Sequence, residues 1–166
     1  MTKRQSVVLL TAAAVSAALA VAAVATPPSG ILSGTVVARG SFVDAVDIKL
    51  KVDGGRGQEV IQVRDARETV MQQIVIGPGG QTGWHSHPGP VVVLVKGGEL
   101  TLYTEDDCAG RTYSAGQAFI DSGQGHAHVA YNHSPSENTE LWVTYFDVPP
   151  GQPFRLDAPN PGTCGF

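Results

Sequence analysis

The chain has 166 residues, enough for one domain. Hydrophobic residues make up 42% of it and charged residues only 16%, so an apolar core is available and wholesale disorder is not expected. The formal net charge is −4, and no cluster of Lys and Arg supplies the contacts that phosphate groups require. We therefore expect no nucleic-acid partner.

The beginning of the chain is typical of an export signal. Lys3 and Arg4 precede an uncharged apolar stretch, residues 7–25, which ends in the small-residue site 23–25. This order predicts a signal peptide over residues 1–25. An uncleaved signal anchor is the alternative, because an apolar stretch of this length can cross a bilayer. Under either interpretation the rest of the chain lies outside the cytoplasm, and it contacts a membrane only if the signal stays attached.

Cys108 and Cys164 are the two cysteines of the chain. An even number of cysteines in an exported protein favours a disulfide, which here would tie the C-terminal end to a mid-chain loop. Two unrelated thiols are the alternative interpretation. No histidine or other base lies beside Cys108 in the sequence, so we do not expect a nucleophilic thiol there.

The rest of the chain is predicted to form short strands. Apolar and charged residues alternate between Ala45 and Val52, and Lys96-Gly97-Gly98 is a hairpin-turn signal. Further apolar runs, separated by Gly, Pro, Asn and Asp, cover residues 60–63, 69–76, 91–95, 99–103, 118–121, 128–132 and 141–146. No window has helical spacing, so the sequence predicts an all-β fold, a sandwich or barrel with little or no helix outside the signal.

The domain organisation follows from these runs and from the turn-forming residues between them. We expect a linker over residues 26–34, a single β-barrel over residues 35–150 and an irregular tail over residues 151–166, which is rich in Pro and Gly.

The five histidines occur in two short stretches, His85 and His87 and then His126, His128 and His133. Residues i and i+2 of a strand point to the same face, so His85 and His87 would present two imidazoles side by side. Such a pair, with a third ligand from a neighbouring strand, can hold one divalent metal ion. Alone the pair is weak evidence, because it also occurs by chance in surface loops.

The first histidine stretch lies between glycines at characteristic distances. Gly79 stands six positions before His85, and Gly97 or Gly98 closes the run that follows His87. This pattern resembles the first signature of the cupin superfamily, which is Gly, five residues, His-x-His, three or four residues, Glu, six residues and Gly. The glycines and histidines match that signature, whereas its acidic residue has no counterpart.

The second stretch resembles the second cupin signature, which is Gly, five residues, Pro-x-Gly, two residues, His, three residues and Asn. Gly125, His128 and Asn132 match its second half at the family spacing. Gly116 matches the opening glycine with one extra residue, and Gly123 stands at the position of the proline. Two signatures in the right order are more specific than either alone.

The resemblance implies a cupin barrel, which is a double-stranded β-helix or jelly roll, with metal ligands at His85, His87 and His128. The carboxylate of the first signature would fall at Pro90 or Val91, where no acidic residue stands. One interpretation is that three imidazoles and water hold a divalent ion such as Fe, Mn, Zn or Ni. The other is that the metal has been lost and the histidines line a ligand pocket.

The remaining residues of the second motif are assigned by strand parity. His126 shares the parity of His128 and could serve as a fourth ligand, but the glycines that flank Gln124 favour a loop and place His126 at the rim. His133 has the opposite parity and is expected to face solvent. Asn132 is expected to make a hydrogen bond that ends a hairpin.

The leading functional hypothesis is an exported single-domain cupin that binds a divalent metal and a small organic molecule, with a metal-dependent dioxygenase as the first catalytic interpretation. The alternative is a non-catalytic module of the cell envelope that binds a small ligand or a metal. A third hypothesis is a structural role with a homodimer paired through a strand at residues 31–39. The fold alone does not choose among these functions.

Overall fold

The computed structural model describes residues 25–54 and 57–166, so the predicted signal peptide lies outside the described residues except for Ala25. The strands are β1 (Ser29–Ser41), β2 (Ile48–Gly54), β3 (Gly57–Val63), β4 (Glu68–Gln81), β5 (His85–Ser86), β6 (Val91–Gly97), β7 (Glu99–Thr104), β8 (Asp107–Ser114), β9 (Ala118–Asp121), β10 (His128–Tyr131), β11 (Thr139–Val148) and β12 (Leu156–Asp157). The described residues contain no helix, so the all-β prediction is confirmed. Accordingly, this part of the chain offers no helix that could span a membrane.

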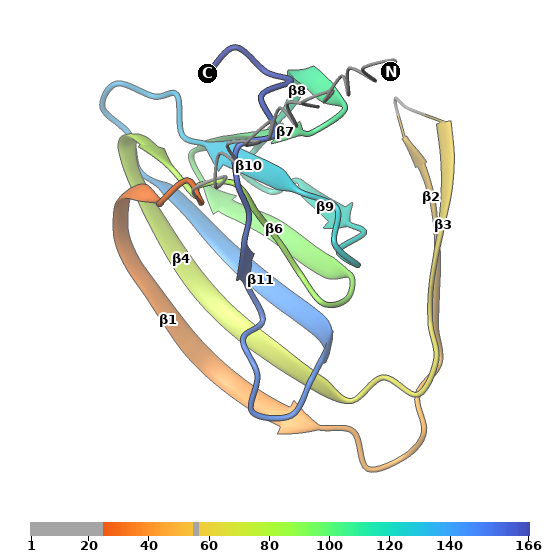
Figure 1. The fold of residues 1–166 in the computed structure, drawn as a ribbon. Helices are drawn as coiled ribbons and strands as arrows, with labels where there is room; N and C mark the ends of the chain where they lie inside the picture. The colour runs from red at the N-terminus through yellow and green to blue at the C-terminus, as the bar shows by residue number, and fades with distance from the viewer. Residues whose placement is uncertain (1–24, 55–56) are drawn as a thin grey trace, which may run out of the picture.

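Ten of the strands form one antiparallel sheet that folds back on itself into a nearly closed barrel (Figure 1). One layer has the order β1-β4-β11-β6-β9, and the other has the order β8-β7-β10-β5-β12. The layers join where Tyr131 of β10 pairs with Gln81 at the end of β4. Two facing antiparallel layers built in this way are the arrangement of a jelly roll.

The core lies between the two layers and follows the period of two that strands impose. In β11, Leu141, Val143 and Tyr145 are buried, while the residues between them are partly exposed. Both layers contribute to the main apolar cluster, which consists of Val70, Ile76, Val91, Val93, Val95, Leu100, Phe119, Ala130, Leu141, Val143, Tyr145 and Val148. This cluster fills the barrel and leaves the polar groups of β5, β9 and β10 at one end of it.

The segment expected to be a linker is ordered by pairing. Strand β1 begins at Ser29, so residues 29–34 are part of a strand that pairs with β4. Ahead of it, the N–H of Thr26 donates to the carbonyl of Ala158 at 3.3 Å. The linker prediction was therefore wrong for these residues, because pairing with distant strands cannot be read from local composition. β1 is exposed along its whole length and, among the described strands, pairs only with β4; the homodimer stays a prediction.

Strands β2 and β3 form a separate two-stranded sheet beside the barrel (Figure 1). The alternation predicted for residues 45–52 is confirmed, since Val46, Ile48 and Leu50 are half-buried and the charged residues between them are exposed. The side-chain amide of Gln124 donates to the carbonyl of Gln62 at 3.1 Å, which ties the hairpin to the loop before β10.

The tail is more regular than its composition suggests. β12 pairs with β5, with Asp157 opposite His85, so the prediction of a wholly irregular tail over residues 151–166 was wrong at this point. The predicted disulfide is present between Cys108 and Cys164, and it fixes the end of the tail against β8. The tail therefore extends the sheet beside β5, the strand that carries His85.

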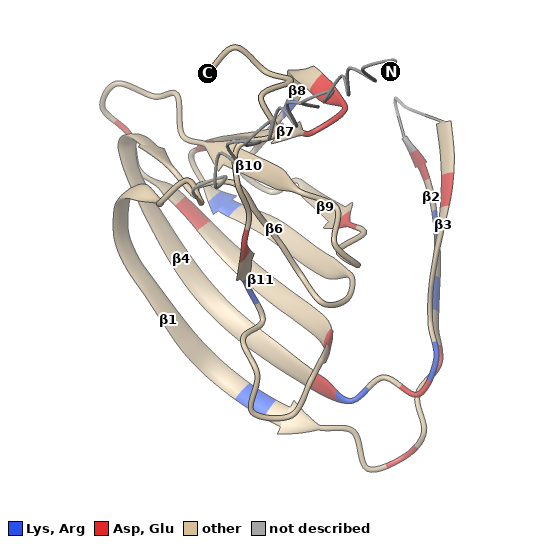
Figure 2. Ribbon diagram, in the orientation of Figure 1, with Lys and Arg blue, Asp and Glu red and all other residues tan. Residues whose placement is uncertain are grey.

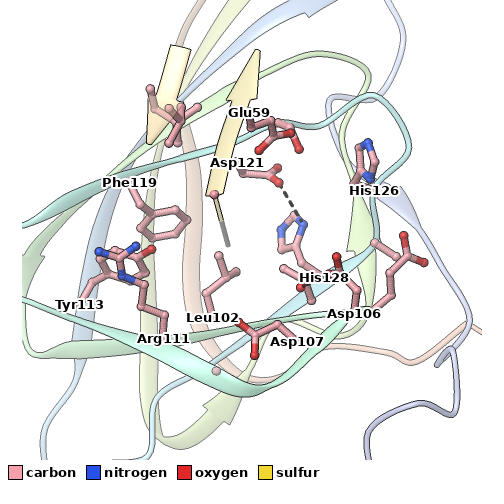
Figure 3. A pocket seen from close by; sticks show the side chains of 18 of the residues that line it. Glu59, Leu102, Asp106, Asp107, Arg111, Tyr113, Phe119, Asp121, His126 and His128 are labelled. Carbon is pink, nitrogen blue, oxygen red and sulfur yellow. Dashed lines mark hydrogen bonds and ion pairs between the residues drawn. The ribbon is translucent and has the colours of Figure 1, made fainter. Parts of the chain in front are cut away.

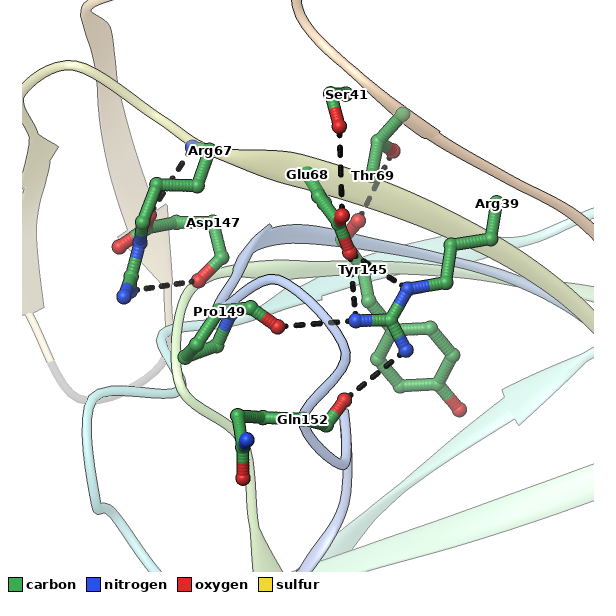
Figure 4. A network of polar contacts seen from close by, with 9 residues as sticks. All are labelled: Arg39, Ser41, Arg67, Glu68, Thr69, Tyr145, Asp147, Pro149 and Gln152. Carbon is green, nitrogen blue, oxygen red and sulfur yellow. Dashed lines mark hydrogen bonds and ion pairs between the residues drawn. The ribbon is translucent and has the colours of Figure 1, made fainter.

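A polar network fixes the start of the tail (Figure 4). Arg39 of β1 donates to the carboxylate of Glu68 at 2.6 Å and to the carbonyls of Pro149 and Gln152 at 2.9 and 3.0 Å. The hydroxyl of Ser41 donates to the same carboxylate at 3.3 Å. One guanidinium thus joins β1, β4 and the chain that leaves β11.

Candidate metal centre

The three histidines that match the sequence motifs meet at one point. His85 of β5 lies opposite His128 of β10 in the sheet, and His87 follows β5 directly. The ring centroids are 4.9 Å apart for His85 and His87, 4.3 Å for His85 and His128, and 5.2 Å for His87 and His128. One nitrogen from each ring lies within 4.8 Å of the other two. The cluster therefore fits a metal ion.

Hydrogen bonds to backbone carbonyls fix two of these rings. The Nδ1–H of His85 donates to the carbonyl of Gly83 at 2.8 Å, and that of His87 donates to the carbonyl of Phe154 at 2.7 Å. In a neutral ring this leaves the lone pair on Nε2, which is the form that binds a metal. The carbonyl of Phe154 comes from the tail, so the tail sets the orientation of His87.

Burial keeps the imidazoles neutral. The exposed fractions of His85, His87 and His128 are 6%, 4% and 5%. Loss of hydration lowers the pKa of His87 and of His128 to about 4 and lowers the pKa of His85 well below its usual 6.5, with the neighbouring rings adding to the shifts of His85 and His87. Neutral imidazoles at pH 7 need no deprotonation before they bind a metal.

A cavity of about 740 Å³ lies beside the cluster (Figure 3). The β2–β3 hairpin, strands β7 to β9 and the loop before β10 form its walls, and Asp121 and His128 line it. A smaller cavity of about 40 Å³ inside the barrel is lined by His87, Asp121, His128, Tyr145 and apolar side chains. Asp121 and His128 therefore lie between an open chamber and an apolar interior.

Most of the charged residues that line the larger cavity are acidic. Figure 2 shows acidic residues at the β7–β8 turn, on β9, and on β2 and β3 near their connection. The lining carries the carboxyl groups of Asp53, Glu59, Glu105, Asp106, Asp107 and Asp121 and the guanidinium of Arg111. This lining creates a negative potential in the approach to the imidazoles.

The structure adds a carboxylate that the sequence motifs did not show. Asp121 is 8% exposed, and its carboxylate lies 3.5 Å from Nδ1 of His128 and 3.9 Å from Nε2 of His87. Burial raises the pKa of Asp121, while the backbone N–H of Gly123 and the charge of His87 lower it. Because both histidines have a pKa of about 4, these contacts are not ion pairs at neutral pH.

Sequence reasoning missed Asp121 because it searched for the carboxylate within the first motif. Asp121 ends β9 and pairs directly with Val91 of β6, one of the two positions where the motif would carry its acidic residue. Paired residues of antiparallel strands point to the same face. The available signal was Asp121 itself, an acidic residue at the end of an apolar run within the second motif.

The other predicted residues lie outside the cluster. His126 is exposed and lines the wall of the large cavity, so the structure places it at the rim. His133 is exposed on the surface, where its Nε2 lies 2.9 Å from the hydroxyl of Tyr103. Asn132 is buried, and its amide donates to the carbonyls of Gly77 and Glu137 at 3.0 and 2.7 Å. The expectation that it ends a hairpin was wrong, because β10 and β11 do not pair; its hydrogen bonds join β4 to the loop between these strands.

Comparisons with known proteins found similarity to solved structures over part of the chain. No family model and no curated protein matches the sequence. Similar solved structures include a cupin-like protein from Thermotoga maritima (24% identity, 46% of this chain and 55% of that chain, TM-score 0.42) and a cupin domain from Bordetella pertussis (20%, 63% and 94%, TM-score 0.42). A third is an oxalate oxidase (23% identity, 48% of this chain and 41% of that chain, TM-score 0.41).

The chain thus spans about half the length of the Thermotoga protein and less than half of the oxalate oxidase. Two of these three structures are cupins by name.

Proposed function

We propose that this chain is an exported cupin that binds a divalent metal ion through His85, His87 and His128 and oxidises a small organic molecule as a metal-dependent dioxygenase. One observation carries the proposal: three buried, neutral imidazoles converge beside a cavity, and two of them are held by carbonyls with Nε2 left for a metal. Iron, manganese, zinc and nickel all accept such ligands, and iron and manganese suit oxygen chemistry best.

The protein side chains have separate tasks in this reaction. When bound, the ion would supply Lewis-acid and one-electron redox chemistry. The carbonyls of Gly83 and Phe154 orient two of the rings, and the apolar interior beyond them excludes water. Burial raises the pKa of Tyr145, so its hydroxyl stays protonated and donates to Gln72 at 2.8 Å, within the barrel and beside His87.

The charge of the cavity supports a particular class of substrate. Its carboxyl groups, including those of Asp53, Glu59 and Glu105, would repel a carboxylate or phosphate that approaches the imidazoles. A volume of about 740 Å³ accommodates a small organic molecule. We therefore propose a neutral or positively charged substrate.

The proposed location has its own support. A disulfide joins Cys108 and Cys164, and the described residues hold no free cysteine. Structural disulfides persist in oxidising compartments and are rare where glutathione keeps thiols reduced. This favours the extracytoplasmic location that the predicted signal peptide would produce.

Elemental analysis of the purified protein tests the metal site. We expect about one divalent ion per chain in the wild type and in the control variant His133→Ala, which removes an exposed histidine outside the cluster. His85→Ala and His128→Ala should each lower the affinity by more than about 100-fold. A wild type that takes up no metal would contradict the proposal.

Oxygen uptake tests the reaction on the metal-loaded protein. Neutral and cationic small molecules, such as phenols and aromatic amines, should drive oxygen consumption more strongly than carboxylic acids of the same size. Stoichiometric metal without oxygen consumption for any member of the panel would reject the dioxygenase and favour the non-catalytic binding module.

A further inference from the structure

We propose that Asp121 is a fourth ligand of the metal ion held by His85, His87 and His128, so that the site offers three imidazoles and one carboxylate. This inference rests on the proposed function, because it concerns the same site. It assigns the negative charge that three neutral imidazoles lack to Asp121, a position at which neither motif specifies an acidic residue.

The carboxylate of Asp121 lies almost as close to two of the imidazoles as ligands of one metal ion lie to each other. One carboxylate oxygen of Asp121 lies 3.9 Å from Nε2 of His87, and the other lies 3.5 Å from Nδ1 of His128. Two ligand atoms bound to one ion at about 2.1 Å lie roughly 3.0–3.4 Å apart, depending on the bond angle. A shift of less than about 1 Å would therefore bring the carboxylate into the coordination sphere.

One oxygen of the Asp121 carboxylate lacks a hydrogen-bond partner, whereas the carboxylate does accept a hydrogen bond from the backbone N–H of Gly123. Oδ2 of Asp121 and Nδ1 of His128 are both buried and have no hydrogen-bond partner. Among the described residues, no Lys or Arg forms an ion pair with Asp121. A buried carboxylate that faces neutral rings is costly, and native proteins rarely leave one of its oxygens without a cation or a hydrogen-bond donor. A divalent ion would satisfy both atoms at once.

The fold holds Asp121 beside the imidazoles. The three imidazoles belong to one layer of the barrel, whereas Asp121 ends β9 in the other layer, so the carboxylate closes the site from the facing side. The loop after it contains Gly123 at φ +61°, where any Cβ would collide with the carbonyl of Gly89. This close approach fixes the loop after Asp121 against the loop after His87.

Titration of metal-free protein with Mn²⁺, followed by calorimetry, tests the assignment. Asp121→Asn is nearly isosteric and should weaken Mn²⁺ binding by about 10- to 100-fold. The matched control is Glu59→Gln, which removes the same charge from an exposed side chain of the same cavity and should change the affinity by less than about 3-fold. Asp121→Glu keeps a carboxylate and should recover part of the affinity that Asn loses.

The absorption spectrum of the Co²⁺-loaded protein provides a second readout, since visible bands of Co²⁺ respond to its ligands. We expect the bands to shift in Asp121→Asn and to stay unchanged in Glu59→Gln. If both variants keep the wild-type affinity and spectrum, Asp121 is not a ligand, although the three-histidine site stands. If the wild type binds neither Mn²⁺ nor Co²⁺, the proposed function itself fails.

Discussion

Two carboxylates of this protein, Glu68 and Asp121, have opposite surroundings at similar burial. The side chain of Glu68 is 13% exposed and contacts the guanidinium of Arg39 at 2.6 Å, with a further hydrogen bond from Ser41. The side chain of Asp121 is 9% exposed and contacts His87 and His128, which are neutral at pH 7, and one of its oxygens has no partner. Both oxygens of the first carboxylate have partners, whereas one oxygen of the second has none.

This difference separates a carboxylate that stabilises the fold, Glu68, from one that we propose binds a metal ion, Asp121. Arg39 donates hydrogen bonds to the carboxylate of Glu68 and to two backbone carbonyls at the start of the tail. These bonds hold two strands and the tail together, as structural ion pairs do. In the site, by contrast, no Lys or Arg among the described residues forms an ion pair with the carboxylate of Asp121. Metal-binding sites commonly sacrifice stability of the empty protein in this way.

Among the substitutions, the largest expected effect comes from the disulfide, because the tail connects the two regions. Cys108 and Cys164 are 56 residues apart, and opening a loop of this size in the double variant Cys108→Ser with Cys164→Ser should lower the free energy of unfolding by about 4 kcal/mol. Urea unfolding of the double variant and the wild type measures the change.

The same variant should also weaken metal binding, since the tail carries the carbonyl of Phe154 that orients His87. The matched control is Arg39→Met, which loosens the start of the tail and leaves its end tied by the disulfide. A double variant as stable as the wild type, with the same Mn²⁺ affinity, would show that the tail does not support the site.

The stability of the metal-free protein should depend on pH through the histidine cluster and not through the network around Arg39. The pKa of His87 and of His128 is about 4 in the folded chain, against 6.5 for an ordinary histidine. As the pH falls from 6.5 to 4, the unfolded chain binds protons that the folded chain does not, so stability present above pH 6.5 is lost across this window. The loss should be on the order of 3 kcal/mol for each imidazole.

Urea unfolding at several pH values in the presence of a chelator measures this loss. His133→Gln should leave the profile unchanged, because that side chain is exposed. A stability that stays flat between pH 6.5 and 4 would mean that the cluster is hydrated and titrates normally, and the contrast between the two regions would disappear.

Much of the fold could be predicted from the sequence. Alternation of apolar and charged residues identified the β2 strand. Lys96-Gly97-Gly98 marked the boundary between β6 and β7, but the hairpin expected there was wrong, because these strands lie in different layers and do not pair. Strand β8 was missed, because Asp107–Ser114 is mostly polar and lies on the exposed edge of its layer. Such a strand exists through its pairing with β7, which no local pattern reports.

Only the site residues whose positions follow from their spacing along the chain could be predicted. His85 and His87 share a face by strand parity, and the second motif supplied His128, which the structure places opposite His85. Asp121 could not be assigned, because its position beside the rings depends on how the two layers face each other. The same holds for Phe154, whose carbonyl reaches His87 across 67 residues of chain.

The smallest expected effect is a change in the free energy of unfolding, and it has opposite signs for Glu68 and Asp121. Glu68→Gln should lower the free energy of unfolding of the metal-free protein by about 1 kcal/mol, since it removes a charged partner of Arg39. Asp121→Asn should raise it by about 1 kcal/mol at neutral pH, since it removes a buried charge that has no cationic partner.

The pH fixes the sign of the second change. Burial raises the pKa of Asp121 above its ordinary 3.8, so ionisation of this group costs the folded chain stability at neutral pH, and the cost vanishes below pH 3.8. The gain from Asp121→Asn should therefore be present at pH 7 and shrink on acidification, whereas saturating Mn²⁺ should reverse it. If both variants destabilise the metal-free protein alike, Asp121 is a structural carboxylate of the same kind as Glu68.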